Sequence, residues 1–229
     1  MSLDGMVKLG LMAVALSASA ATKDWLDLQP RHVMPADEPM YLTSGETLKR
    51  ASFGYHAVLA DWYWIRTIHY FGSRVEAQRG RLDALDLREM PWLKDLLAMT
   101  VALDPHHVAA YRFGAFFLAS TDTAYALHFA REGLRENPQE WRLYHDLGFL
   151  YWRLGRYREA ADAYERGSRI SGAPLWMQSM AAAMLARGGE RETARAIFTQ
   201  LLESTDDEFI RDVCRTQLEI LTREQPARP

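Results

Sequence analysis

The chain has 229 residues, of which 48% are hydrophobic and 25% are charged, and its formal net charge is −3. This length and composition are enough to bury a sizeable core, and they resemble neither a disordered tail nor a polytopic membrane protein. Acidic and basic residues are interspersed, so the chain lacks the excess of one charge sign that is typical of a general nucleic-acid binder. Cys214 is the only cysteine in the sequence, which excludes an internal disulfide and a thiolate metal cluster.

The first predicted element is an apolar segment near the N-terminus. Lys8 precedes the run LGLMAVALSASAA at residues 9–21, which is too short to span a bilayer comfortably at about 1.5 Å of rise per residue. The small residues at 18–20 give an A-x-A cleavage pattern, so residues 1–21 are expected to be a signal peptide or a membrane anchor. The protein is then expected to be exported, or anchored and facing the periplasm. The alternative is a buried first helix in a cytoplasmic protein.

Residues 22–43 are predicted to form an extended strap. Three prolines interrupt this charged stretch, and each removes a backbone hydrogen-bond donor. The sequence TSGE at 43–46 then has the spacing of a capping box, so a helix is expected to begin there. It opens an N-terminal helical unit over residues 44–106.

The most aromatic part of this unit is DWYWIRTIHYFG at residues 61–72. A helix is expected over 55–71, ending at Gly72. Because this helix is apolar nearly all the way round, it is predicted to be covered on most sides. The preferred interpretation is a hairpin with residues 91–103, roofed by the helix at 45–52.

The same aromatic helix has an alternative interpretation as an interface, since Trp and Tyr favour interfaces with proteins and membranes. Asp61 within it is expected to pair with Arg66 or His69, because an unpaired buried charge is costly. The candidate interface residues are Trp62, Tyr63, Trp64, Tyr70 and Phe71.

The following part of the chain repeats in three consecutive blocks of equal length, 107–140, 141–174 and 175–208. Positions eight and twenty of each block are small, which lets two helices approach closely, and position fifteen is Thr or Gly, where a turn separates them. Each block is therefore predicted to be a helix hairpin, and such repetition is the signature of a stacked architecture. The small residues are Gly114, Gly148 and Ala182 at position eight and Ala126, Ala160 and Ala194 at position twenty.

The length of the blocks, the motif WRLYHDLGFLYWRLGRYREAADAYERG at 141–167 and the ENP that closes the preceding block resemble tetratricopeptide (TPR) repeats. This resemblance covers about half of the chain. More broadly, the segment LADWYWIRTIHYFG at 59–72, followed by ALDP at 102–105 and YRFG at 111–114, resembles uncharacterised exported or membrane-anchored bacterial TPR proteins. The resemblance implies an all-α fold: a right-handed α-solenoid of TPR-like hairpins over 107–208, with the irregular helical unit before it. Residues 209–229 are expected to supply a capping helix and a tail.

In the TPR family the first helices of successive hairpins line a concave groove, and the resemblance implies that the same block positions do so here. The groove is expected to be basic and aromatic, which suits an extended or helical peptide with acidic and apolar side chains. The alternative is that these aromatic residues pack between helices and the arginines are ordinary solvated surface. The candidate groove residues are Tyr111, Arg142, His145, Phe149, Trp152, Arg153, Trp176 and Arg187.

Motifs for catalysis are absent from the sequence: it has no G-x-S-x-G, P-loop, H-E-x-x-H, G-x-G-x-x-G or C-x-x-C. No catalytic residue, metal ligand, cofactor or small-molecule substrate is therefore assigned, and nucleic acid is not an expected partner. The predicted function is a non-catalytic protein–protein interaction or assembly scaffold that binds a partner protein or peptide. The alternatives are an anchored structural subunit of a membrane-associated complex, docking through residues 55–71, and an enzyme that a missing partner completes.

Overall fold

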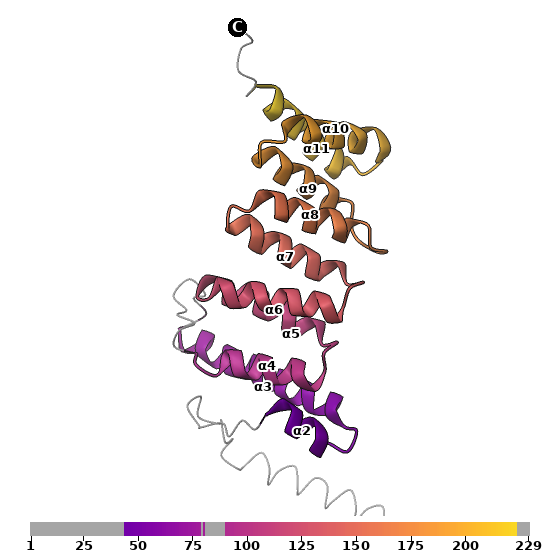
Figure 1. Ribbon diagram of the computed structural model, residues 1–229. Helices are drawn as coiled ribbons and strands as arrows, with labels where there is room; N and C mark the ends of the chain where they lie inside the picture. Colours follow the sequence, from indigo (N-terminus) through magenta and orange to yellow (C-terminus); the bar gives the residue numbers. More distant parts are fainter. Residues whose placement is uncertain (1–43, 79, 81–89, 224–229) are drawn as a thin grey trace, which may run out of the picture. The chain divides into compact units, whose positions relative to one another are not determined.

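The computed structural model describes residues 44–78, 80 and 90–223. Every regular element within these ranges is a helix (Figure 1), which confirms the predicted all-α class for this part of the chain. The apolar run and the strap lie outside the described residues. The elements are α2 (Gly45–Ala51), α3 (His56–Ala77), α4 (Leu93–Leu103), α5 (Val108–Phe117), the 3-10 helix η3 (Leu118–Ser120), α6 (Thr123–Glu136), α7 (Trp141–Arg153), α8 (Tyr157–Ser168), α9 (Trp176–Arg187), α10 (Arg191–Ser204) and α11 (Glu208–Arg223).

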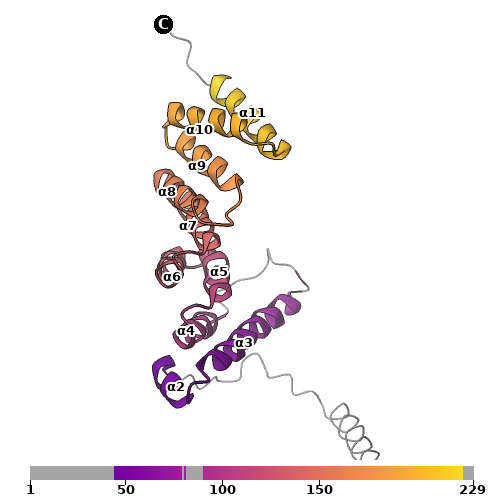
Figure 2. The same ribbon diagram turned by 90° about the vertical axis from the view of Figure 1, so that its right-hand side faces the viewer.

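Helices that are neighbours in sequence are also neighbours in space. From α3 to α11, each helix packs against the next, and α5 additionally lies beside α7 and α9 beside α11. Figure 2 shows the pairs α5 and α6, α7 and α8, and α9 and α10 following one another in chain order. This is a helical repeat, as the three blocks of the sequence indicate.

The small residues at position eight explain how closely the hairpin helices pack. A Cβ built on Gly148 of α7 lies 2.9 Å from the ring of Tyr164 in α8, and one built on Gly114 of α5 lies 2.6 Å from the ring of Phe129 in α6. Both rings are almost completely buried. Glycine at these two positions therefore makes room for an aromatic side chain of the second helix, which seals each hairpin.

The turns between the hairpin helices differ between the blocks. Gly155 and Gly189 have φ values of 70° and 91°, a backbone conformation that glycine adopts without steric cost. The first block has Thr121 at the same position, and there the turn is made by η3. The 3-10 turn replaces the left-handed residue, so the hairpin closes without a glycine.

The N-terminal unit differs from expectation in where its helices begin and end. The N-cap of α2 is Ser44, whose Oγ accepts a hydrogen bond from Thr47 N at 3.2 Å. The predicted cap at Thr43 lies outside the described residues. The prediction that the second helix ends at Gly72 is wrong, because α3 continues to Ala77. Glycine only disfavours a helix interior by about 1 kcal/mol, and the helix continues beyond it here.

The start of α6 carries the best-defined cap among the hairpins. The carboxylate of Asp122 accepts a hydrogen bond from Tyr125 N at 2.9 Å and another from Lys94 Nζ of α4 at 2.6 Å. The hydrogen bonds from Lys94 and Tyr125 hold the pKa of Asp122 below its ordinary value. Asp122 therefore caps one helix and ties it to another in its ionised form.

We expect Asp122 to make stability dependent on acid pH. The pKa of Asp122 is lower in the folded state than in the unfolded state. Its contribution to the free energy of unfolding is therefore complete above the unfolded-state pKa of about 3.9 and is lost as the pH falls through the lower folded-state pKa. Asp122→Asn keeps an N-cap acceptor but has no charge to titrate, so its stability should change less over this pH range. Urea unfolding of both proteins at a series of pH values measures this, and parallel profiles for the two would contradict it.

Candidate functional site

The five aromatic residues proposed as an interface on α3 divide into buried and exposed side chains. Tyr63, Tyr70 and Phe71 are buried, whereas Trp64 is half-buried and Trp62 is 45% exposed. The Phe71 ring packs at 4.4 Å from that of Phe117, and the Trp64 ring lies 5.6 Å from that of Phe113, so α3 is fixed against α5 by ring contacts. Tyr63, Tyr70 and Phe71 therefore belong to the core, as the preferred interpretation of a covered helix expects, and the alternative interpretation as an interface is wrong for these three residues.

The predicted partners of Asp61 are also wrong. Its Oδ1 lies 3.7 Å from Nε2 of His107, at the start of α5, and no ion pair joins it to Arg66 or His69 within the described residues. The Asp61 side chain is 72% exposed, so solvent reduces the cost that a buried charge would carry. Arg66 instead lies over the ring of Trp62, 4.6 Å from its centroid.

Tyr111 is not a groove residue, although its position in the repeat predicts one. Its side chain is fully buried, and its ring lies 4.9 Å from the ring of Phe129. A Cβ on Gly133 would lie 2.7 Å from the Tyr111 ring, so this glycine of α6 accommodates it. Burial raises the pKa of the Tyr111 hydroxyl well above its ordinary value. Tyr111 therefore packs inside the first hairpin.

His145 and Trp176 connect the first helices of the second and third blocks. Their rings lie 5.3 Å apart, and Trp176 also meets Trp141 at 6.0 Å. Nδ1 of His145 lies 2.9 Å from Oδ1 of Asp146, which can only accept, so Nδ1 carries the hydrogen. The other oxygen of Asp146 accepts from Arg112 Nε of α5 at 2.8 Å. These half-buried groups hold α5, α7 and α9 together.

Five side chains form a second, more accessible feature across the same three helices, and we call it the aromatic–arginine surface. The Phe116 ring of α5 stacks on the Phe149 ring of α7 at 6.2 Å, and Phe149 in turn contacts the Trp152 ring at 5.7 Å. Arg153 lies over Phe149 at 6.0 Å, and Arg187 of α9 lies over Trp152 at 5.8 Å. The surface therefore links three consecutive repeats.

The two arginines of this surface differ from the other predicted groove arginine. Arg153 and Arg187 are exposed, and neither forms an ion pair within the described residues. Arg142 is exposed too, but its Nη1 lies 2.9 Å from Oε1 of Glu140. The structure thus brings Phe149, Trp152, Arg153 and Arg187 together, with Arg142 engaged locally.

Phe116, 60% exposed, is the residue of this surface that sequence reasoning missed. It stands at position ten of its block, and the corresponding Leu150 of the next block is fully buried. Ala115 stands at position nine of the first block, the block position of the groove candidate Phe149 in the second block, and it is buried. The ring that stacks on Phe149 therefore comes from position ten of the first block, and a comparison of positions nine and ten in the sequence would have identified Phe116.

The chemistry available here is recognition. The guanidinium groups of Arg153 and Arg187 can each hold a carboxylate through two hydrogen bonds, and the neighbouring rings offer apolar contact area. Within the residues that the structure describes, no group of three or more His, Cys, Asp or Glu side chains could hold a metal ion. The described ranges also contain no helix that combines the length and the apolarity needed to cross a membrane.

No protein-family model matches the chain, and no curated protein sequence matches it significantly. Among solved structures, the chain is similar to one described as "Crystal structure of MamA protein". The two share 16% sequence identity over 77% of this chain and 100% of that chain, with a TM-score of 0.42. A likeness this distant carries no argument about function.

Proposed function

We propose that the protein is a non-catalytic protein–protein interaction scaffold whose TPR-like hairpins wind into a right-handed solenoid. Its aromatic–arginine surface binds an acidic segment of a partner protein or peptide that also carries an aromatic or large apolar side chain. The observation that supports this most directly is the pair of exposed arginines, Arg153 and Arg187, each held over an aromatic ring and neither neutralised by a carboxylate of the described chain.

The arginines are positioned before any partner arrives. A cation–π contact at an exposed site is worth about 0.5–1 kcal/mol, which limits the conformations that each long side chain samples. An arginine that is already oriented loses less conformational entropy when it binds a carboxylate. The surface is therefore favourable for a partner with acidic groups spaced to reach α7 and α9.

The exposed ring of Phe116 supports an apolar component in the partner. Its stacking on Phe149 keeps it in place, and 60% of its surface remains accessible to solvent. Aromatic side chains that a partner covers are common sites of large binding energy, because they bury much area with few rotatable bonds. An aromatic or aliphatic partner residue would cover Phe116 while nearby carboxylates reach the arginines.

A displayed library of random peptides tests this function. The wild-type chain should select peptides rich in Asp and Glu with at least one aromatic or large aliphatic residue. Phe116→Ala should weaken binding of those peptides about tenfold, since a single central aromatic contact of this kind is worth about 1–2 kcal/mol. Fluorescence anisotropy with a labelled selected peptide measures the change.

Phe209→Ala is the matched control, because Phe209 of α11 is 68% exposed and lies outside the aromatic–arginine surface. It should bind the peptides as the wild type does. Selection of peptides without acidic residues, or equal losses for the two variants, would count against this surface as the binding site.

We further propose that the scaffold works outside the cytoplasm or anchored facing the periplasm. The support is the apolar run at 9–21 with its A-x-A pattern, which lies outside the described residues. Fractionation of cells that express the full chain tests this, and recovery only in the cytoplasmic fraction would contradict it.

A further inference from the structure

The outer side of α3 exposes a continuous apolar stripe. Val58, Trp62, Ile65 and Ile68 are 63%, 45%, 54% and 40% exposed, and their spacing of three or four positions places them on one face of the helix. Phe53 and Tyr55, just before α3, are also exposed, at 92% and 70%. Monomeric soluble proteins rarely leave an apolar patch of this extent uncovered.

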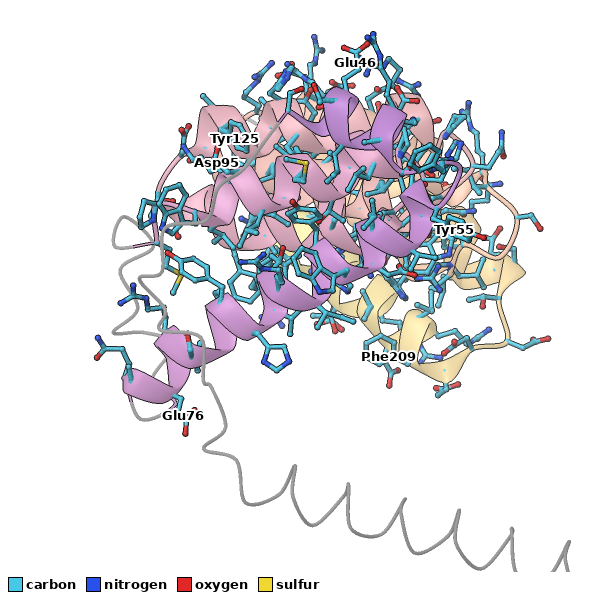
Figure 3. The ribbon with its side chains drawn as sticks, turned by 90° about the horizontal axis from the view of Figure 1, so that it is seen from below. Glu46, Tyr55, Glu76, Asp95, Tyr125 and Phe209 are labelled. Atoms are coloured by element: carbon cyan, nitrogen blue, oxygen red, sulfur yellow. The ribbon has the colours of Figure 1, made fainter. Side chains whose placement is uncertain are left out.

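The neighbours of α3 explain why the described helices leave the stripe exposed. Among the described helices α3 packs extensively only against α4, and its ring contacts with α5 use the opposite, buried side. Figure 3 shows α3 running from Tyr55 to Glu76, with the end near Glu76 projecting beyond the neighbouring helices. The stripe is therefore a surface that no described element covers.

The polar residues on this face do not suit a lipid surface. The side chains that share it are Asp61, His69 and Glu76, all exposed, whereas Arg66, which flanks the stripe, is half-buried and lies over the ring of Trp62. A helix that lies on a membrane usually carries several exposed Lys or Arg side chains beside its apolar stripe, which anionic headgroups attract. Two acidic side chains on the stripe instead favour a protein partner with a complementary pattern.

We propose that the stripe pairs with the same stripe of a second copy of this chain, with the two α3 helices antiparallel and the two-fold axis at Ile65. Residues equally distant from Ile65 then face each other. Trp62 lies opposite Ile68 of the second copy, Val58 lies opposite Gly72 of the second copy, and Ile65 meets its own equivalent. An interface of this kind is self-complementary, as a two-fold dimer requires.

We infer the register of the two α3 helices from Gly72. It stands in the interior of α3, where glycine is unfavourable, yet a Cβ built on it meets nothing within 4 Å in the described chain and its backbone does not need a glycine. Packing among the described residues therefore gives no reason for this glycine. In the antiparallel pair, the missing side chain leaves room for Val58 of the second copy and lets the two helix backbones approach.

The polar groups on the stripe also match in this register. Asp61 lies opposite His69 of the second copy, and an imidazole N–H can donate a hydrogen bond to a carboxylate in either protonation state. Two such pairs form, related by the two-fold axis. In a parallel pair of helices in register, each Asp61 would instead face the Asp61 of the second copy and repel it.

Cross-linking of the full chain tests both the pairing and its register. Ile65→Cys should form a disulfide-linked dimer under mild oxidation, since the two-fold axis brings the two thiols together. The natural Cys214 is fully buried and does not compete. The control is Ile220→Cys, at a 40% exposed position on α11. We expect the Ile65→Cys chain to cross-link at least about tenfold faster, and equal rates would overturn the proposal.

Sedimentation of the full chain without oxidant provides the second test. Ile65→Arg places two cations at the centre of the interface and should raise the dimer dissociation constant about 100-fold. A wild-type chain that stays monomeric at every concentration, or an Ile65→Arg chain that associates as the wild type does, would overturn the proposal. Ile65→Arg should leave binding of the selected acidic peptides unchanged and Phe116→Ala should leave dimerisation unchanged, so the failure of one proposal is separable from the failure of the other.

Discussion

Replacement of Tyr164 by alanine is expected to lower the free energy of unfolding by about 3–5 kcal/mol. The Tyr164 side chain is 1% exposed, and its ring fills the space that Gly148 leaves on α7. Burial also raises the pKa of the Tyr164 hydroxyl to about 12. Alanine would leave a cavity in the middle hairpin, which both neighbouring hairpins contact. Urea unfolding followed by circular dichroism measures the loss.

The control for this prediction is Phe209→Ala, which also replaces an aromatic residue by alanine. Because Phe209 is 68% exposed, we expect a change of no more than about 0.5 kcal/mol. If Tyr164→Ala were no more destabilising than Phe209→Ala, the second hairpin would not be packed around the Tyr164 ring.

Reversal of both free charges on the aromatic–arginine surface should have the largest effect on binding. The double variant Arg153→Glu with Arg187→Glu is expected to weaken binding of an acidic peptide selected by the wild type by about 100-fold, or about 2.7 kcal/mol. Two attractions become two repulsions, while the fold is unaffected because both side chains are exposed and form no ion pair in the described chain. Isothermal titration at low salt measures this, and added salt should reduce the difference.

The double variant Arg166→Glu with Arg223→Glu changes the net charge of the protein by the same amount. Arg166 and Arg223 are exposed on α8 and α11, where each forms an ion pair with an acidic side chain one helical turn earlier in the same helix. Binding should fall far less than in the first variant. Equal losses would mean that the peptide responds to the overall charge of the protein, which would argue against recognition at this surface.

The hairpin order could be predicted from the sequence because its signals are local and repeated. Small residues at position eight and turn residues at position fifteen recur from block to block, and each constrains only the helix pair in which it lies. In the described structure, Gly148 makes room for the Tyr164 ring and Gly155 makes the turn at a φ of 70°. The repetition alone therefore predicts that helices α5 to α10 pair in order.

The candidate site could be predicted only in part. Phe149, Trp152, Arg153 and Arg187 lie together on one surface, as their repeat positions suggest. Tyr111 occupies a groove position and is buried, whereas Phe116 occupies a core position and is exposed. The first hairpin ends α5 with a 3-10 turn instead of a glycine turn, and the face that it presents to α7 is shifted by one position.

The sequence by itself determined the all-helical class, the hairpins and the aromatic character of α3. Only the tertiary structure decided which side of α3 is core, because a helix that is apolar all round has no periodicity from which to identify its buried face. Burial of Tyr63, Tyr70 and Phe71 and exposure of Trp62 and Ile65 depend on where α4 and α5 lie. Helix formation depends on residues that are near one another in the chain. The exposure of a side chain depends on elements that are distant in the chain, so only the packed fold shows which side chains are exposed.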